Sequence, residues 1–135
     1  MITGELHGAE SVTRYLHSSR DWSNLAKRAK PSAFDPGSRY DEISAAHISG
    51  LEERVVWELS RRTLSGQPGR QAVLARADLK VEAVLRLGLK AIRDNDPFER
   101  HTAIRGWQNE TRKSTALALS LAADLHVAPE PIRSV

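Results

Sequence analysis

The chain has 135 residues, of which 40% are hydrophobic and 27% charged, as is ordinary for one soluble globular domain. It contains no cysteine, which excludes disulfides and thiolate chemistry. No apolar run approaches the roughly 20 residues of a membrane-spanning helix, and residues 1–5 lack the pattern of a signal peptide. We therefore expect a cytoplasmic protein with a mild basic bias, its net charge being +3.

Aromatic residues are few, with three Trp, two Tyr and two Phe. The core must then consist mostly of Leu, Val, Ile and Ala, which favours packed helices over a β-sandwich. No stretch shows strand alternation of useful length. The predicted fold class is all-α: a small helical domain of four to five helices with a long C-terminal helix.

Residues 1–37 are predicted to form two short helices and a linker. Apolar side chains recur at helical spacing over 9–18 and again over 21–29. Pro31 should stop the second helix, because proline disfavours the α conformation of the residue before it. The remaining residues, 38–135, are predicted to form a helical core.

The first two helices of this core are predicted over 38–63 and 70–93. Gly50 costs about 1 kcal/mol relative to Ala inside a helix, so a break there into two shorter helices is an alternative. Residues 74–86 have some features of a helix-turn-helix but carry Leu79 where the sharp turn usually has Gly. A continuous helix over that stretch is the other interpretation.

The long C-terminal helix is predicted over 96–126. Asp96 is placed as its N-cap and Pro97 at its first position, and Pro129 and Pro131 prevent its continuation. A helix of about 30 residues is about 45 Å long, which exceeds the diameter of a small domain. Part of its apolar stripe should therefore pack on another subunit. The expected oligomer contacts are Trp107, Ala118, Leu121 and Leu125.

Positive charge is concentrated in residues 54–93, where nine basic residues stand against three acidic ones. A basic stripe along a helix would neutralise DNA phosphates, although the same pattern also suits a solvated helix face. The candidate nucleic-acid contacts are Arg61, Arg62, Arg70, Arg76, Lys80, Arg86 and Lys90, together with the separate cluster Lys27, Arg28 and Lys30.

Catalytic and metal-binding motifs are not recognisable in the sequence. The five histidines show no pair at helical i,i+3 or i,i+4 spacing and no carboxylate at metal-ligand spacing. A glycine-rich phosphate loop is also missing from the sequence. We expect no cofactor, no metal site and no enzymatic activity.

The chain ends on an acidic residue, a Leu-x-Val-x-Pro pattern and a short tail. The residues of this pattern are Leu125, Val127 and Pro129. Residues 107–135 thereby resemble the end of small terminase subunits of tailed bacteriophages, which finish with a long polar-faced helix and a similar motif. Here His126 stands where Gly is common and Ala128 where Thr is common, and the tail has one basic residue.

The resemblance implies a non-enzymatic protein of viral genome packaging in the host cytoplasm. Such subunits form rings, recognise double-stranded viral DNA and regulate the ATPase and nuclease of a large terminase subunit. Two alternatives remain open at this point. One is a small helical transcription regulator or antitoxin, motivated by residues 74–86. The other is a helical protein-binding adaptor or phage-encoded inhibitor with no nucleic-acid role.

Overall fold

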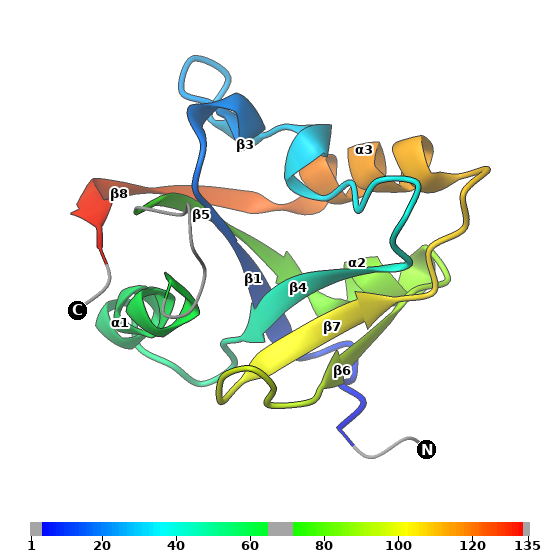
Figure 1. The fold of residues 1–135 in the computed structure, drawn as a ribbon, viewed down its shortest axis with the longest axis horizontal. Coiled ribbons are helices and arrows are strands. Elements are labelled where there is room, and N and C mark those ends of the chain that lie inside the picture. The colour runs from blue at the N-terminus through cyan, green and yellow to red at the C-terminus, as the bar shows by residue number, and fades with distance from the viewer. Residues whose placement is uncertain (1–3, 65–71, 134–135) are drawn as a thin grey trace.

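The computed structural model describes residues 4–64 and 72–133, and its centre is an antiparallel sheet of six strands (Figure 1). The strand order is β6-β7-β4-β1-β5-β8. The strands are β1 (Ser11–Leu16), β4 (Glu42–His47), β5 (Val73–Lys80), β6 (Lys90–Arg93), β7 (His101–Arg105) and β8 (Asp124–Ile132). A small second sheet pairs β2 (Trp22–Ser23) with β3 (Arg28–Ala29).

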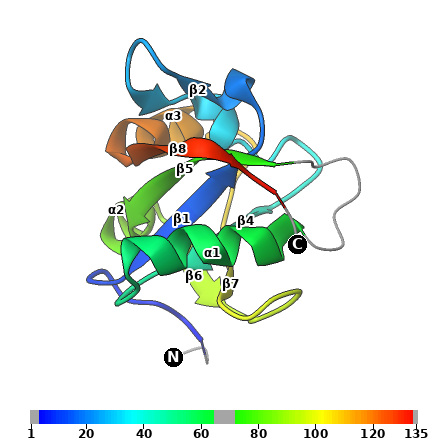
Figure 2. The same ribbon diagram turned by 90° about the vertical axis from the view of Figure 1, so that its left-hand side faces the viewer.

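The helices of the described residues are α1 (Glu53–Leu64), α2 (Val81–Arg86) and α3 (Arg112–Ala122), with 3-10 turns η1 (Ser19–Asp21) and η2 (Pro31–Ala33). Figure 2 shows α1 on one side of strands β5 and β8 and α3 on the other. None of these described helices has the length and apolar character needed to cross a membrane.

The all-α prediction is therefore wrong. The stretch 9–18 holds β1, and 21–29 holds β2 and β3. The described part of the predicted helix over 70–93, from residue 72 onward, is the succession β5, α2 and β6. The cause is visible in β5, where Val73, Ala75, Ala77 and Leu79 are all buried and the last three alternate with the charged residues Arg76, Asp78 and Lys80. This period of two is the strand pattern, but Ala and Leu are also good helix formers, so local composition favoured the wrong structure.

The helix-turn-helix interpretation of residues 74–86 is wrong for the same reason, since most of that stretch is strand β5. The predicted helix over 38–63 also contains a strand. Its first part is β4, its second part is α1, and Gly50 lies between them at a φ of 76°. That positive φ suits glycine and ends any continuous helix there.

The long C-terminal helix does not form. Asp96 and Pro97 lie in the turn between β6 and β7, and the helix that follows later, α3, has 11 residues. The expected subunit contact rested on an apolar stripe longer than the domain, and a helix of 11 residues has no such stripe. Trp107 is buried in the core and donates its indole N–H to the Ile104 carbonyl. The other expected contacts differ in exposure: Leu125 packs partly against the core, Ala118 is half-buried and Leu121 is exposed.

The main core lies between the sheet and the layer made by α2, α3 and η2. Its fully buried side chains include Val12, Phe34, Val84, Ile104 and Leu119. A smaller apolar cluster, made by Ala46, Ile48, Val56 and Leu59, fixes α1 on the opposite face of the sheet. β1, which comes from the N-terminal 37 residues, lies between β4 and β5 at the centre of the sheet.

Candidate ligand-binding cleft

The central sheet opens between β1 and β4. These strands pair through Val12 with His47 and Thr13 with Ala46, and the Ile48 N–H donates to the Ser11 carbonyl at 3.0 Å. β1 nevertheless stays paired with β5 as far as Leu16, and β4 stays paired with β7 from Glu42 onward. The two halves of the sheet therefore separate beyond Thr13, and the gap between them is bounded by rigid strands.

The side chain of Arg14 spans this gap. Its Nε donates to the Ala33 carbonyl at 2.9 Å, and its Nη1 donates to the Ser44 carbonyl at 2.6 Å. Both acceptors are neutral main-chain oxygens. Arg14 thus joins η2 to β4 across the opening, where the main-chain ladder between β1 and β4 has stopped, and its guanidinium is held in a fixed orientation.

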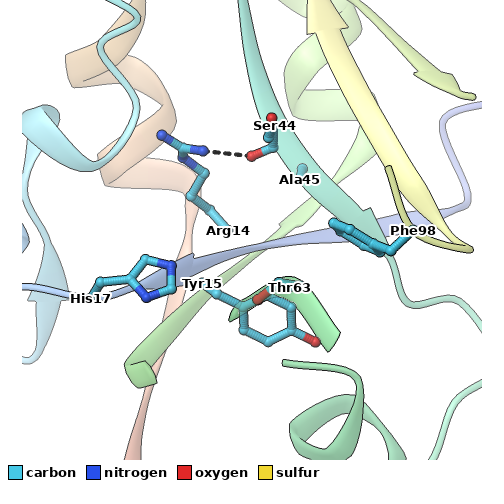
Figure 3. A pocket seen from close by; sticks show the side chains of 7 residues that line it. All are labelled: Arg14, Tyr15, His17, Ser44, Ala45, Thr63 and Phe98. Carbon is cyan, nitrogen blue, oxygen red and sulfur yellow. Dashed lines mark hydrogen bonds between the residues drawn. The ribbon is translucent and has the colours of Figure 1, made fainter. Parts of the chain in front are cut away.

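Two hollows meet at Arg14, Tyr15 and His17, and together we call them the β1–β4 cleft. The larger has a volume of about 230 Å³ and is completed by Leu16, Asp21, Ser32 and Ala33. The smaller, of about 30 Å³, is completed by Ser44, Ala45, Thr63 and Phe98 (Figure 3). Because successive side chains of a strand alternate between faces, Arg14 and Tyr15 line the cleft from opposite sides of the sheet.

Tyr15 forms a fixed wall of the cleft. Its hydroxyl donates to the Val56 carbonyl of α1, at 2.5 Å. Burial raises the pKa of Tyr15 far above its ordinary value of 10.0, so the ring stays neutral. His17 places its Nδ1 3.1 Å from the Ala72 carbonyl, an acceptor that assigns the donor role to this nitrogen. Both side chains are therefore oriented by main-chain carbonyls.

The cleft presents a cation and an aromatic ring, which are groups able to contact an anion with an attached ring. A guanidinium matches the oxygens of a phosphate or carboxylate, and Phe98 adds an aromatic wall. Asp21, which accepts a hydrogen bond from Ser32 at 2.9 Å, supplies the opposite charge at the far end. The volume is below the range of about 300–1,000 Å³ for drug-sized ligands, so the cleft would enclose only part of such a molecule.

A second, more voluminous hollow of about 430 Å³ lies between residues 37–41 and 107–112. Its lining comes from two loops and the start of α3. Its cation Arg112 already contacts Asp35 at 2.8 Å and Asn109 at 2.8 Å. Sites on strands hold their groups more precisely than sites on loops. The β1–β4 cleft is therefore the stronger candidate. Among the residues described by the structure, no group of three or more His, Asp or Glu is placed to hold a metal ion.

Arg76, one of the sequence-predicted nucleic-acid contacts, is only 2% exposed. Its guanidinium donates to both carboxylate oxygens of Glu53 at 3.0 and 2.8 Å, contacts Asp78 at 3.1 Å and lies 4.6 Å from the centre of the Trp57 ring. The hydrogen bonds from Arg76 lower the pKa of Glu53. Arg76 therefore ties α1 to β5, and its donors do not point at solvent.

The other predicted nucleic-acid contacts are distributed over the molecule. Arg61 and Arg62 lie on α1, Lys80 and Lys90 lie at the end of β5 and on β6, and Arg86 pairs with Glu82 at 2.6 Å on α2. Lys27, Arg28 and Lys30 belong to the β2–β3 hairpin, and Arg70 lies outside the described residues. Because residues 73–93 form a strand, a helix and a strand, a stripe along one helix does not bring these cations onto one face.

The cleft residues were not among the sequence-predicted sites. One signal for them exists in β1, where Arg14 falls in phase with the buried side chains of Val12 and Leu16. A charged side chain on the apolar face of a strand lowers stability unless it is hydrogen-bonded or paired, so its presence there marks a position of interest. Nothing in the local sequence marks Ser44, Thr63 and Phe98 as cleft residues, because the pairing of distant segments brings them together.

An ion pair near the β6–β7 turn gives a pH-dependent prediction. His101 Nδ1 lies 2.6 Å from Asp94 Oδ1. Burial opposes ionisation of Asp94, but the hydrogen bond from His101 and nearby main-chain N–H groups outweigh it and lower the pKa of this carboxyl below its ordinary 3.8. The stability it adds is present above pH 3.8 and is lost as the pH falls through the lowered pKa.

We expect Asp94→Asn to flatten the loss of stability on acidification. Urea unfolding followed from about pH 5 to about pH 2 measures this. The control is Asp41→Asn, which changes an exposed carboxylate in the loop before β4. An acid slope in Asp94→Asn as steep as that of the wild type would contradict the role assigned to this pair.

Comparison with known proteins finds no match for this chain among protein-family models, curated proteins or solved structures. The resemblance to small terminase subunits stays a prediction. The geometry and chemistry of the cleft are therefore the basis for a function.

Proposed function

We propose that the protein binds a small phosphate-bearing ligand of the nucleotide class in the β1–β4 cleft. The observation that carries the proposal is the guanidinium of Arg14, held across a gap between two strands by the carbonyls of Ala33 and Ser44. Planar guanidinium groups recognise phosphate oxygens through paired N–H donors. A guanidinium fixed by its surroundings loses little side-chain entropy when such a ligand binds.

The rest of the lining supports a nucleotide rather than a bare anion. Phe98 offers an apolar ring surface against which a base can pack. Ser44 and Thr63 supply hydroxyl groups, and Asp21 supplies an acceptor for the hydroxyl or amino groups of a sugar or base. The proposal includes no chemical reaction.

Calorimetric titration with adenosine and guanosine monophosphate, with adenosine and inorganic phosphate as partial ligands, tests this function. Arg14→Gln should weaken monophosphate binding about tenfold or more, since a charge-assisted bond contributes about 1.5–3 kcal/mol. Arg14→Lys keeps the positive charge but lacks the paired N–H donors of a guanidinium. Its affinity for a monophosphate should lie between those of the wild type and Arg14→Gln. Adenosine, which has no phosphate, should lose much less affinity in Arg14→Gln.

The matched control is Arg39→Gln, which removes an exposed arginine from the loop before β4, outside the cleft. It should bind as the wild type does. Circular dichroism confirms that Arg14→Gln is folded. Wild-type protein that binds none of these phosphates, or an Arg14→Gln variant that binds them with unchanged affinity, would contradict the proposal.

Binding of double-stranded DNA in a phage packaging complex, as in small terminase subunits, is a second proposal. It rests on the excess of basic residues in residues 54–93 and on the C-terminal resemblance. The described cations of that segment lie on α1, β5, α2 and β6. Binding through such scattered charges would be weak, indifferent to sequence and strongly dependent on salt.

A further inference from the structure

A groove runs along the outer side of α1, next to the segment that leads into β7. It has a volume of about 150 Å³. We call it the α1 groove, and its lining residues are Leu51, Arg54, Val55, Glu58, Leu59, Arg62 and Arg100. Three of these seven side chains are arginines, and the floor between them is aliphatic.

The charge of the α1 groove is positive. Arg54 and Arg62 are exposed, and within residues 4–64 and 72–133 neither has a hydrogen bond or ion pair to its side chain. The groove's acid, Glu58, lies 3.4 Å from Arg61 on the same helix, so its charge is balanced by a residue outside the groove. An approaching anion would meet Arg54 and Arg62 with their donors directed to solvent.

Arg100 is the fixed cation of the groove. Its Nε donates to the His47 carbonyl at 2.7 Å and its Nη2 to the Ser49 carbonyl at 3.1 Å. Burial, together with the nearby charge of Arg93, lowers the pKa of Arg100. The surroundings of Arg100 therefore disfavour the charged form of its guanidinium. A bound anion would relieve that cost, because an opposite charge favours the ionised form.

The α1 groove and the β1–β4 cleft take lining residues from the same two segments of the chain. Thr63 lines the cleft and the preceding residue, Arg62, lines the groove. Phe98 lines the cleft, and Arg100, two residues on, lines the groove. The end of α1 and the segment before β7 thus contribute to both hollows.

We propose that the α1 groove binds the phosphodiester backbone of a single-stranded nucleic acid whose terminal nucleotide occupies the β1–β4 cleft. This rests on the function proposed for the cleft. Arg54 and Arg62 are eight residues apart, about 12 Å along the helix, so they address two different phosphates rather than one. A basic groove beside a surface that holds a base is the usual arrangement for binding single strands.

The size of the cleft favours a single strand over a duplex. Its two hollows, of about 230 and 30 Å³, take one unpaired nucleotide at most. A duplex end would present a base pair that does not enter. The unpaired end is therefore the feature that the cleft would select, while Arg54, Arg62 and Arg100 bind the backbone without reading sequence.

Fluorescence anisotropy with a labelled single-stranded oligonucleotide of about ten nucleotides tests the inference. The double variant Arg54→Glu, Arg62→Glu should weaken oligonucleotide binding about tenfold or more. It should also reduce the log–log dependence of affinity on salt by about 0.7 for each phosphate that is no longer neutralised. Its affinity for a mononucleotide should stay within about twofold of the wild type. The matched control, Arg86→Glu with Lys90→Glu, reverses the same number of charges on α2 and β6 and should weaken oligonucleotide binding much less.

The outcomes separate this inference from the function of the cleft. An oligonucleotide that binds no tighter than a mononucleotide overturns the groove and leaves the cleft standing. Equally weakened binding in the two double variants overturns it as well, since only net charge would then matter. Two results contradict the placement of the strand end in the cleft. One is an oligonucleotide affinity that is unchanged in Arg14→Gln, and the other is a blunt duplex that binds as tightly as the single strand. Failure of every mononucleotide and oligonucleotide to bind removes both proposals.

Discussion

Replacing Arg76 with methionine is expected to lower the free energy of unfolding by about 3 kcal/mol. The substitution removes the guanidinium that joins Glu53 of α1 to Asp78 of β5 and leaves two carboxylates without their shared partner. Breaking a buried pair from one side costs about 3–5 kcal/mol. We expect a loss at the lower end of this range because the Glu53 side chain is 63% exposed, so its carboxylate is hydrated once Arg76 is gone.

Urea unfolding at neutral pH measures this effect, with Arg105→Met as the control. Arg105 pairs with Glu42 at 3.4 Å, and both side chains are largely exposed, so removing this pair should change stability by less than about 1 kcal/mol. Similar destabilisation in the two variants would show that Arg76 is not the link between α1 and the sheet.

Leu119→Ala is expected to destabilise the protein by about 2–5 kcal/mol, whereas Leu121→Ala should change its stability by less than about 0.5 kcal/mol. The two leucines lie on the same helix, α3, but Leu119 is fully buried against the main core and Leu121 is 58% exposed. Thermal or urea unfolding of both variants gives the comparison. A large destabilisation in Leu121→Ala would place that side chain in an interface.

Size-exclusion chromatography of Leu121→Ala examines the sequence-based oligomer prediction. If α3 supplies a subunit contact, the variant elutes later than the wild type. If the exposed leucine only faces solvent, the two proteins elute together.

Local sequence signals identified breaks in the chain better than they identified the elements between them. A break at Gly50 is the alternative to a continuous helix over 38–63, and Asp96-Pro97 is the predicted start of the last helix. Both positions lie in connections between elements. The nature of the interruption at Asp96 was misassigned. An acidic residue followed by proline suits a helix start, but it equally suits a turn between two strands.

The sheet was missed because its determinants are non-local. The β1 residue Thr13 bonds to Ala77 and Asp78 of β5, more than 60 positions away. The apolar residues of β5 include two alanines and two leucines over 73–80, and Ala and Leu favour helices when read alone. The pairing of β5 with β1 and β8 is what selects the strand conformation for this alternating sequence.

The cleft is a consequence of that pairing and could not be read from any single segment. Arg14, Ser44 and Phe98 come from three distant parts of the chain and meet because β1 and β4 stop pairing after two residue pairs. Arg76 shows the opposite case. Its charge was recognised in the sequence, but burial against Trp57 gives it a structural role.

The binding of a nucleotide-class ligand in the β1–β4 cleft is tested most directly by nuclear magnetic resonance of isotopically labelled protein titrated with adenosine monophosphate. We expect the largest chemical-shift changes at Arg14, Tyr15, His17, Ser44 and Phe98. Changes concentrated instead at residues 37–41 and 107–112, around the 430 Å³ hollow, or the absence of any saturable change, would contradict binding in the cleft.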